Sequence, residues 1–134
     1  MICILSLYTD YLLGKLDNLY KCEILFENNE RKQILGTIQL TKSVKDFDRI
    51  VIKVGNYAGN LHIDMEQFTF EVPTIIYNDT ATTDNQPGDY TLLFHGGTGA
   101  KTLYFRENKN EIYVTGYMYS TDATIYAVYG IKYR

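Results

Sequence analysis

The sequence has no tryptophan and is poor in the residues that most often carry catalysis, metal ions or covalent cross-links. Its 134 residues include two histidines, two cysteines and two prolines. Neither His62 nor His95 accompanies a serine or cysteine motif typical of an activated nucleophile, and both are expected at the surface or in turns. Two histidines with scattered carboxylates also fall short of an ordinary zinc site. We therefore expect no catalytic residue, no metal site and no cofactor, in a protein that is not an enzyme.

The chain also lacks an excess of positive charge and a long apolar run. The formal net charge is −3, and the basic residues are scattered rather than gathered in a stripe that could follow a nucleic-acid backbone. The apolar start, MICILSLYTDYLLG, is interrupted by Asp10 well before the ~20 residues of a membrane span, and it lacks the basic leader and cleavage site of a signal peptide. Nucleic-acid binding and membrane insertion are therefore not expected.

The two cysteines, Cys3 and Cys22, do not have the spacing of metal ligands. A chain of this length forms one domain and buries about two thirds of its unfolded surface, so its core needs no disulfide bridge. We expect both cysteines to be reduced thiols, in preference to a bridge, as is typical of proteins in a reducing cytoplasm.

Tyrosine is abundant, with thirteen residues. Tyrosine is favoured on pleated sheets and at interfaces, where the ring is buried while the hydroxyl group finds a partner. So many rings indicate contact surfaces.

A period-2 alternation of apolar and polar residues dominates the chain and predicts β-strands. The stretch 36–55 reads as two strands joined by one helical turn, in which Val44 and Phe47 face the core. Further strands are predicted at 21–27, 61–72 with a break near Glu66, 74–77, 90–95, 100–106, 111–119 and 125–133. About nine short strands separated by turn signals predict a mainly β, antiparallel, jelly-roll-like β-sandwich over residues 21–134.

The first 20 residues show a different, helical pattern. Apolar residues recur at spacings of three and four, at Leu5, Tyr8, Leu12, Leu16 and Leu19. We expect a short N-terminal helix over residues 1–20. It either packs on the sheet or forms an oligomerisation stem that joins copies of the chain.

Two loops carry residue types that suggest a ligand. Asp79, Asp84 and Asp89 lie in the polar loop 78–89, but they lack the regular spacing of a calcium-binding loop. The string GGTGAKT resembles a phosphate-binding loop, but Ala100 precedes the Lys-Thr pair and a strand follows, so a hairpin turn is the better interpretation. Neither loop predicts a metal or nucleotide site.

Two segments resemble a small domain found near the C-termini of tail fibre and baseplate proteins of phages and prophages. The first has the pattern GTIxL…SxxxFDxIxIxxG, and the second has the closing pattern IYxVxGIKY. The matching positions are Gly36, Thr37, Ile38, Leu40, Ser43, Phe47, Asp48, Ile50, Ile52, Gly55, Ile125, Tyr126, Val128, Gly130, Ile131, Lys132 and Tyr133. The matched residues are core positions, so the resemblance bears on fold more than on activity.

The resemblance implies a structural or receptor-binding component of a phage tail. Such a component would be a homotrimer that contacts other tail or baseplate proteins, in a virion assembled in the bacterial cytoplasm. Its expected activity is adhesion to a host cell-surface saccharide. A purely architectural trimerisation or capping domain is the leading alternative. A small saccharide hydrolase, using carboxylates such as Asp64, Glu66 or Glu71, is a weaker one.

The best candidate contact surface is the tyrosine face of the strand predicted at 111–119. Tyr113, Tyr117 and Tyr119 alternate with apolar residues, so the three rings share one face. Aromatic rings offer apolar area to sugar faces while their hydroxyl groups form hydrogen bonds. With Asp84 in the polar loop, they are the predicted ligand-binding residues. Packing between subunits is the alternative role of this face.

Overall fold

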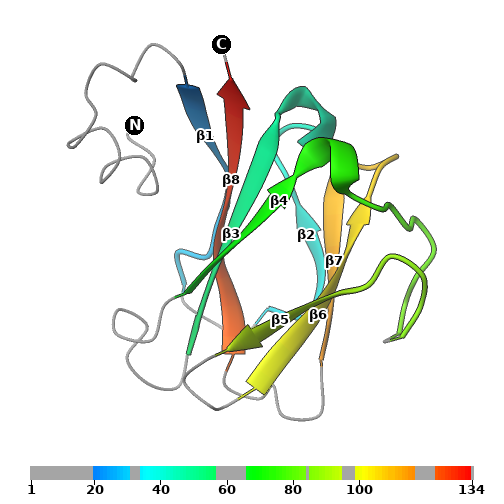
Figure 1. Ribbon diagram of the computed structural model, residues 1–134. Coiled ribbons are helices and arrows are strands. Elements are labelled where there is room, and N and C mark those ends of the chain that lie inside the picture. Colours follow the sequence, from blue (N-terminus) through cyan, green and yellow to red (C-terminus); the bar gives the residue numbers. More distant parts are fainter. Residues whose placement is uncertain are drawn as a thin grey trace.

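The computed structural model describes residues 20–30, 34–56, 66–83, 85–94, 99–116 and 123–133. These residues form eight strands in two four-stranded antiparallel sheets, with two short 3₁₀ helices (Figure 1). The expectation of a mainly β, antiparallel protein is confirmed. The described residues contain no α-helix, and the N-terminal helix expected over residues 1–20 falls almost entirely outside them.

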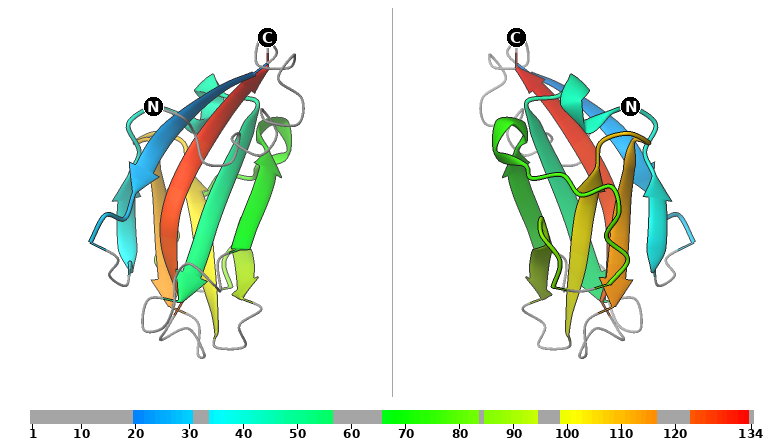
Figure 2. Two further views of the ribbon diagram at one scale, coloured as in Figure 1. Left: turned by 90° about the vertical axis from the view of Figure 1, so that its left-hand side faces the viewer. Right: turned by 90° about the vertical axis from the view of Figure 1, so that its right-hand side faces the viewer.

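Each sheet has its own strand order (Figure 2). Sheet A has the order β1 (Tyr20–Glu27), β8 (Ala123–Tyr133), β3 (Arg49–Asn56), β4 (Glu66–Glu71). Sheet B has the order β2 (Gly36–Gln39), β7 (Glu111–Gly116), β6 (Gly99–Arg106), β5 (Tyr90–Phe94). Strands distant in the sequence are therefore neighbours, most clearly β1 with β8 and β2 with β7.

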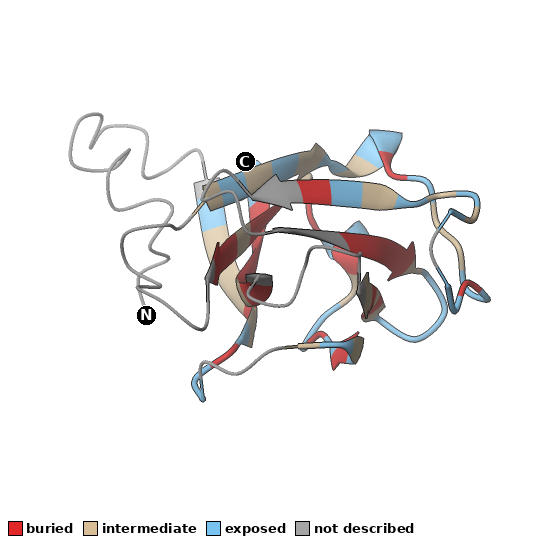
Figure 3. Cartoon of the chain, turned by 90° about the horizontal axis from the view of Figure 1, so that it is seen from below, coloured by how far each residue is buried: buried red, intermediate tan, exposed pale blue. Residues whose placement is uncertain are grey.

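The main core lies between the two sheets, because every strand points alternate residues inward. Its buried members come from both sheets and from the turns between them: Leu25, Ile38, Leu40, Val44, Phe47, Ile50, Ile52, Val54, Ile75, Leu92, Leu103, Phe105, Ile112, Val114, Ile125 and Val128. Figure 3 shows that exposed residues instead gather on turns and connecting loops.

The helical turn predicted between residues 43 and 48 is present as the 3₁₀ helix η2 (Val44–Asp46). The side chain of Ser43 caps it by accepting a hydrogen bond from Lys45 N, as expected of a serine at this position. Val44 and Phe47 are both buried, which confirms that the turn is held on the core.

This turn also joins the segments 36–55 and 125–133, whose sequence patterns were noted above. The Phe47 ring packs on Gly130, where an added Cβ would lie 2.6 Å from the ring. The side chain of Asp48 accepts a hydrogen bond from Tyr133 N at 2.6 Å, and Asp48 N donates to Ile131 O at 2.9 Å. The residues of the pattern therefore hold the last strand in place.

The expected strand at 74–77 is mostly not a strand. The 3₁₀ helix η3 (Val72–Thr74) occupies its start, and only Tyr77 forms an isolated bridge, to Phe105. Pro73 explains the difference, because proline cannot donate to a sheet ladder but fits the first turn of a helix. The residues predicted as a strand at 61–65 lie outside the described part of the chain.

The expectation of reduced thiols is wrong for Cys22, which is disulfide-bonded. Pairing depends on proximity in space, which sequence spacing does not reveal. Cys3 lies outside the described residues. Among the described residues, none belongs to a helix long and apolar enough to cross a lipid bilayer.

Candidate functional site

The outer face of sheet B carries the most elaborate polar arrangement of the described residues. After η3, residues 77–83 and 85–89 cross over β6 and β7, as the right-hand view of Figure 2 shows. We call residues 77–83 and 85–89 the strap. Leu103 and Phe105 of β6 point into the core, so Tyr104 and Arg106 point outward, toward the strap.

The strap begins with a side chain that folds it upon itself. Asn78 Oδ1 accepts hydrogen bonds from Thr80 N and Ala81 N, both at 3.0 Å. Asn78 Nδ2 donates to Pro87 O at 2.7 Å, which joins the two ends of the loop. An asparagine that bonds the following backbone in this way is typical of a turn, so this side chain sets the shape of the strap.

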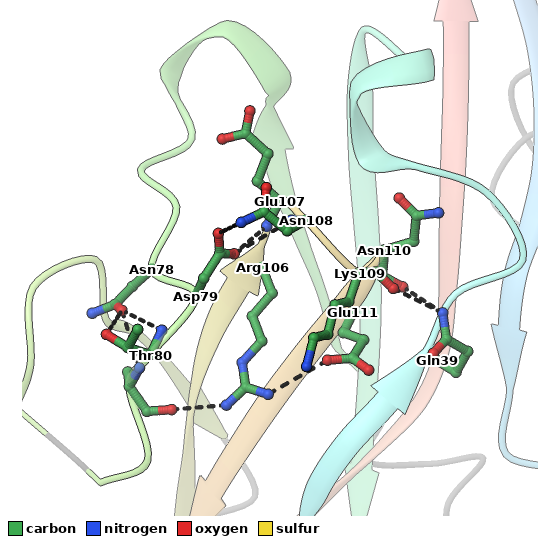
Figure 4. Close-up of polar contacts among 11 residues, drawn as sticks. Gln39, Asn78, Asp79, Thr80, Arg106, Glu107, Asn108, Lys109, Asn110 and Glu111 are labelled. Carbon is green, nitrogen blue, oxygen red and sulfur yellow. Dashed lines mark hydrogen bonds and ion pairs between the residues drawn. The ribbon is translucent and has the colours of Figure 1, made fainter.

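The next residue, Asp79, fixes the strap to the turn between β6 and β7 (Figure 4). Its carboxylate accepts hydrogen bonds from Glu107 N at 2.7 Å and from Asn108 Nδ2 at 2.6 Å. On the other side of the same turn, Gln39 Nε2 donates to Lys109 O at 3.0 Å and to Asn110 O at 3.1 Å. The turn is thus held from β2 and from the strap.

Tyr104 anchors the middle of the strap from below. The residue is fully buried, and its hydroxyl group donates to Thr83 O at 2.7 Å and accepts from Gln86 N at 3.0 Å. Both hydrogen-bonding roles of the phenol are therefore filled by strap backbone. This satisfies a polar group that would be costly to bury alone.

Arg106 lies between the strap and the tyrosine of the neighbouring strand. Its guanidinium group donates from Nη2 to Ala81 O at 2.9 Å and pairs from Nη1 with Glu111 Oε1 at 3.4 Å. The same group lies 4.3 Å from the centroid of the Tyr113 ring, a cation–π contact. The Arg106 and Glu111 side chains are each 14% exposed, so water screens this ion pair less than a fully exposed one.

Of the predicted ligand-binding residues, the structure places Tyr113 on the outer face of β7. Its ring is half-buried under Arg106, and its hydroxyl group donates to Thr82 O at 3.4 Å. Tyr117, Tyr119 and Asp84 lie outside the described residues. A ligand role for them stays a prediction.

Four residues hold the strap, namely Asn78, Asp79, Tyr104 and Arg106. The sequence pattern singled out only Asp79 among them, and as a possible calcium ligand rather than as an anchor of the loop. One signal was available for Asn78, because Asn-Asp-Thr at the start of a polar loop is typical of a side-chain-capped turn. The roles of Tyr104 and Arg106 depend on which segment crosses above β6, which no local pattern gives.

The strap presents polar groups to solvent on its far side. Its exposed residues include Thr82, Thr83, Asn85, Pro87 and Asp89. Asn85 adopts a positive φ of 65°, which this residue type tolerates better than most. Hydroxyl, amide and carboxylate groups on a backbone fixed from beneath can form hydrogen bonds without first being ordered.

Several of the described carboxylates form ion pairs with basic side chains. Glu23 pairs with Lys42 at 2.8 Å, and Glu71 pairs with Arg49 at 2.8 Å. The side chain of Glu107 pairs with Lys45, and this contact raises the pKa of Lys45. No cluster of three or more metal-ligating side chains occurs among the described residues. This placement gives Glu71 a structural role, while Asp64 lies outside the described part.

The chain matches no protein-family model, and no significant match was found among curated proteins or among solved structures.

Proposed function

We propose that this protein is a tail or baseplate component of a phage or prophage that binds a host cell-surface saccharide without chemically altering it. The observation that supports this proposal is the strap, a polar loop anchored by Tyr104, Arg106 and Asp79 on an aromatic sheet face. Saccharides offer many hydroxyl groups and weakly apolar faces, which suit threonine, amide and tyrosine contacts. The sequence patterns at 36–55 and 125–133 link the chain to tail proteins by resemblance alone.

The proposed assembly is a homotrimer that contacts other tail or baseplate proteins. Single saccharide contacts are weak, and several linked copies raise the apparent affinity by a factor on the order of 10²–10⁴. The proposed location is the virion, after assembly in the bacterial cytoplasm. The disulfide bond of Cys22 is compatible with this location, because bridges persist on virion surfaces outside the reducing cytoplasm.

We further propose that the two sheets form a jelly-roll-like sandwich and that residues 1–20 contain a short helix. The antiparallel pairs β1–β8 and β2–β7 support the first part, because eight strands in two sheets with strands from the two ends of the chain paired resemble a jelly roll. The inner strands differ from that nesting, since β3 pairs with β4 and β5 pairs with β6.

The second candidate function is a purely architectural domain that trimerises or caps a tail assembly. It is favoured by the placement of the pattern residues, since Phe47 packs on Gly130 and Asp48 binds Tyr133 N, and both contacts stabilise the fold itself. On this alternative, Tyr113 and its neighbours pack between subunits. A small saccharide hydrolase is the weaker third candidate, and turnover of a saccharide by the purified chain would establish it.

The test is binding of the purified protein to immobilised teichoic acid, peptidoglycan and lipopolysaccharide. We expect one of the three to bind, and we expect a Thr82→Ala, Thr83→Ala double variant to weaken that binding roughly tenfold or more, since each lost contact is repeated in every copy. Thr69→Ala, an exposed threonine on the outer face of β4, is the matched control and should bind as the parent does. Equal effects of the strap and control variants would reject the strap as the site.

Light scattering on the same preparation gives the solution mass. A mass of three chains is expected. A monomer that binds none of the three polymers would contradict the tail-adhesin proposal as a whole, whereas a trimer that binds none would favour the architectural candidate.

A further inference from the structure

A second, smaller apolar cluster lies on the outer face of sheet A, away from sheet B. Its buried residues are Val51 of β3 and Ala127, Tyr129 and Ile131 of β8. Val51, Ala127 and Tyr129 are each 1% exposed, and Ile131 is 8% exposed. The described apolar residues packed against them are Cys22, Ile24 and Tyr126, all of which belong to sheet A itself. We call this cluster the outer patch.

The burial of the outer patch ends sharply at β4. Val51 pairs across strands with Thr69, and Lys53 pairs with Gln67. Thr69 and Gln67 are exposed on the same face on which Val51 is buried. A sheet face open to water would expose both members of each pair, so something covers β1, β8 and β3 and leaves β4 uncovered.

The electrostatics of the neighbouring side chains agree with a cover that excludes water. Burial lowers the pKa of Lys53, which lies half-buried at the rim of the outer patch. Burial also raises the pKa of Tyr129, in the patch itself, with a smaller contribution from Glu27. Both shifts have the direction that removal of water produces.

We propose that the chain's own residues 1–19 cover the outer patch, so that this face is an internal interface and not a docking site for a partner. Cys22 lies on this face and is disulfide-bonded, and the sequence has two cysteines, so Cys3 is the partner that the chain itself supplies. A bridge between them ties the start of the chain to β1.

The sequence of residues 1–19 suits this role. It carries an apolar stripe at Leu5, Tyr8, Leu12, Leu16 and Leu19. Nineteen residues span about 28 Å if helical, close to the length of about 36 Å expected for the eleven residues of β8. The proposal is independent of saccharide binding, and it contradicts a stem in which this stripe joins separate copies.

The first test maps the disulfide in the full-length, air-oxidised protein. The protein is denatured without reductant and alkylated with iodoacetamide. Mass spectrometry then gives the mass of the intact chain and, after digestion, the masses of the peptides. We expect a single-chain mass without added alkyl groups and one linked pair of peptides that contain Cys3 and Cys22. Two alkylated thiols, or a bridge that joins two chains, would overturn the proposal, the latter in favour of a second copy as the cover.

The second test measures urea unfolding of full-length variants. Val51→Lys, in the outer patch, and Leu16→Lys, in the apolar stripe, should each lower the unfolding midpoint by on the order of 1 M. Their matched controls, Thr69→Lys on β4 and Asn18→Lys off the stripe, should leave the midpoint unchanged.

Combining Val51→Lys with Leu16→Lys makes the test specific for contact between the outer patch and residues 1–19. If residues 1–19 cover Val51, displacing them with Leu16→Lys exposes that position, so the double variant should lose little more than either single variant. Additive losses, or no loss from Leu16→Lys, would overturn the proposal. Val51→Thr, which keeps the side-chain volume, replaces Val51→Lys if the latter does not fold.

Discussion

At the scale of single residues, Gly130 is constrained by what lies above it. The Phe47 ring occupies the space into which any larger residue would project its Cβ. Gly36 has the opposite constraint, because it has open space around it but a φ of +93°, in the left-handed region. One glycine is required by packing and the other by backbone conformation.

This difference gives a first prediction. Gly130→Ala should lower the free energy of unfolding by about 2 kcal/mol through overpacking. Adding Phe47→Leu should make the penalty of the alanine substitution smaller, because the contact at 2.6 Å is removed.

Gly36→Ala is the matched control for that prediction. It should cost about 1–2 kcal/mol through backbone strain, and Phe47→Leu should not reduce this cost. Denaturant unfolding of the five variants measures both couplings, and an equal response of the two glycines to Phe47→Leu would disprove the steric explanation.

At the scale of the element, the strap packs closely on sheet B, although it has no regular secondary structure. Ala81 of the strap is fully buried. The Tyr104 hydroxyl group forms hydrogen bonds with the strap backbone at Thr83 and Gln86. A long polar loop held in this way keeps one conformation, which distinguishes it from a simple connection between strands.

The second prediction concerns Tyr104→Phe. Loss of the hydroxyl group leaves Gln86 N and Thr83 O without their partner, which should cost about 1–2 kcal/mol and speed amide exchange at Gln86. Tyr133→Phe is the control, because that hydroxyl group contacts Glu71 at 3.4 Å on an exposed face. Hydrogen–deuterium exchange measures the difference, and an unchanged rate at Gln86 would show that Tyr104 does not hold the strap.

The strands were more predictable from sequence than the strap. Alternation located β2, β3, β6 and β7 closely, because one face of each is apolar and the period is fixed by the backbone. Alternation failed for residues 74–77, because the 3₁₀ helix that contains Pro73 replaces the start of the predicted strand. The contacts of Asp79 and Arg106 join positions about 25 to 30 residues apart, and no local pattern encodes which loop crosses which sheet.

At the scale of the whole molecule, buried tyrosines link stability to alkaline pH. Burial raises the pKa of Tyr77 and of Tyr129 above the ordinary value of 10.0. The unfolded chain therefore loses these protons first. The stabilisation is complete below about pH 10 and is lost as pH rises through the folded-state pKa values.

The third prediction follows from this loss of stability at alkaline pH. The urea midpoint should fall as pH rises above about 10, and absorbance at 295 nm should show a late group of tyrosines that ionise together with unfolding. Tyr77→Phe with Tyr129→Phe should flatten the decline. Burial lowers the pKa of Lys53, so this residue makes stability rise with pH and opposes the effect of the tyrosines. The tyrosine variants are therefore compared in a protein that also carries Lys53→Gln. A decline unaffected by the two substitutions would refute the assignment.

The interior position of β8 in sheet A has a consequence for synthesis on the ribosome. Of the described strands, β8 is made last, yet it pairs with β1, which is made first, and with β3. Until its residues leave the exit tunnel, both of these strands have an unsatisfied edge, and folding of sheet A has to wait. A prematurely terminated product that lacks β8 would therefore expose the unpaired edges of β1 and β3 at the same time, and chaperones and proteases bind such edges.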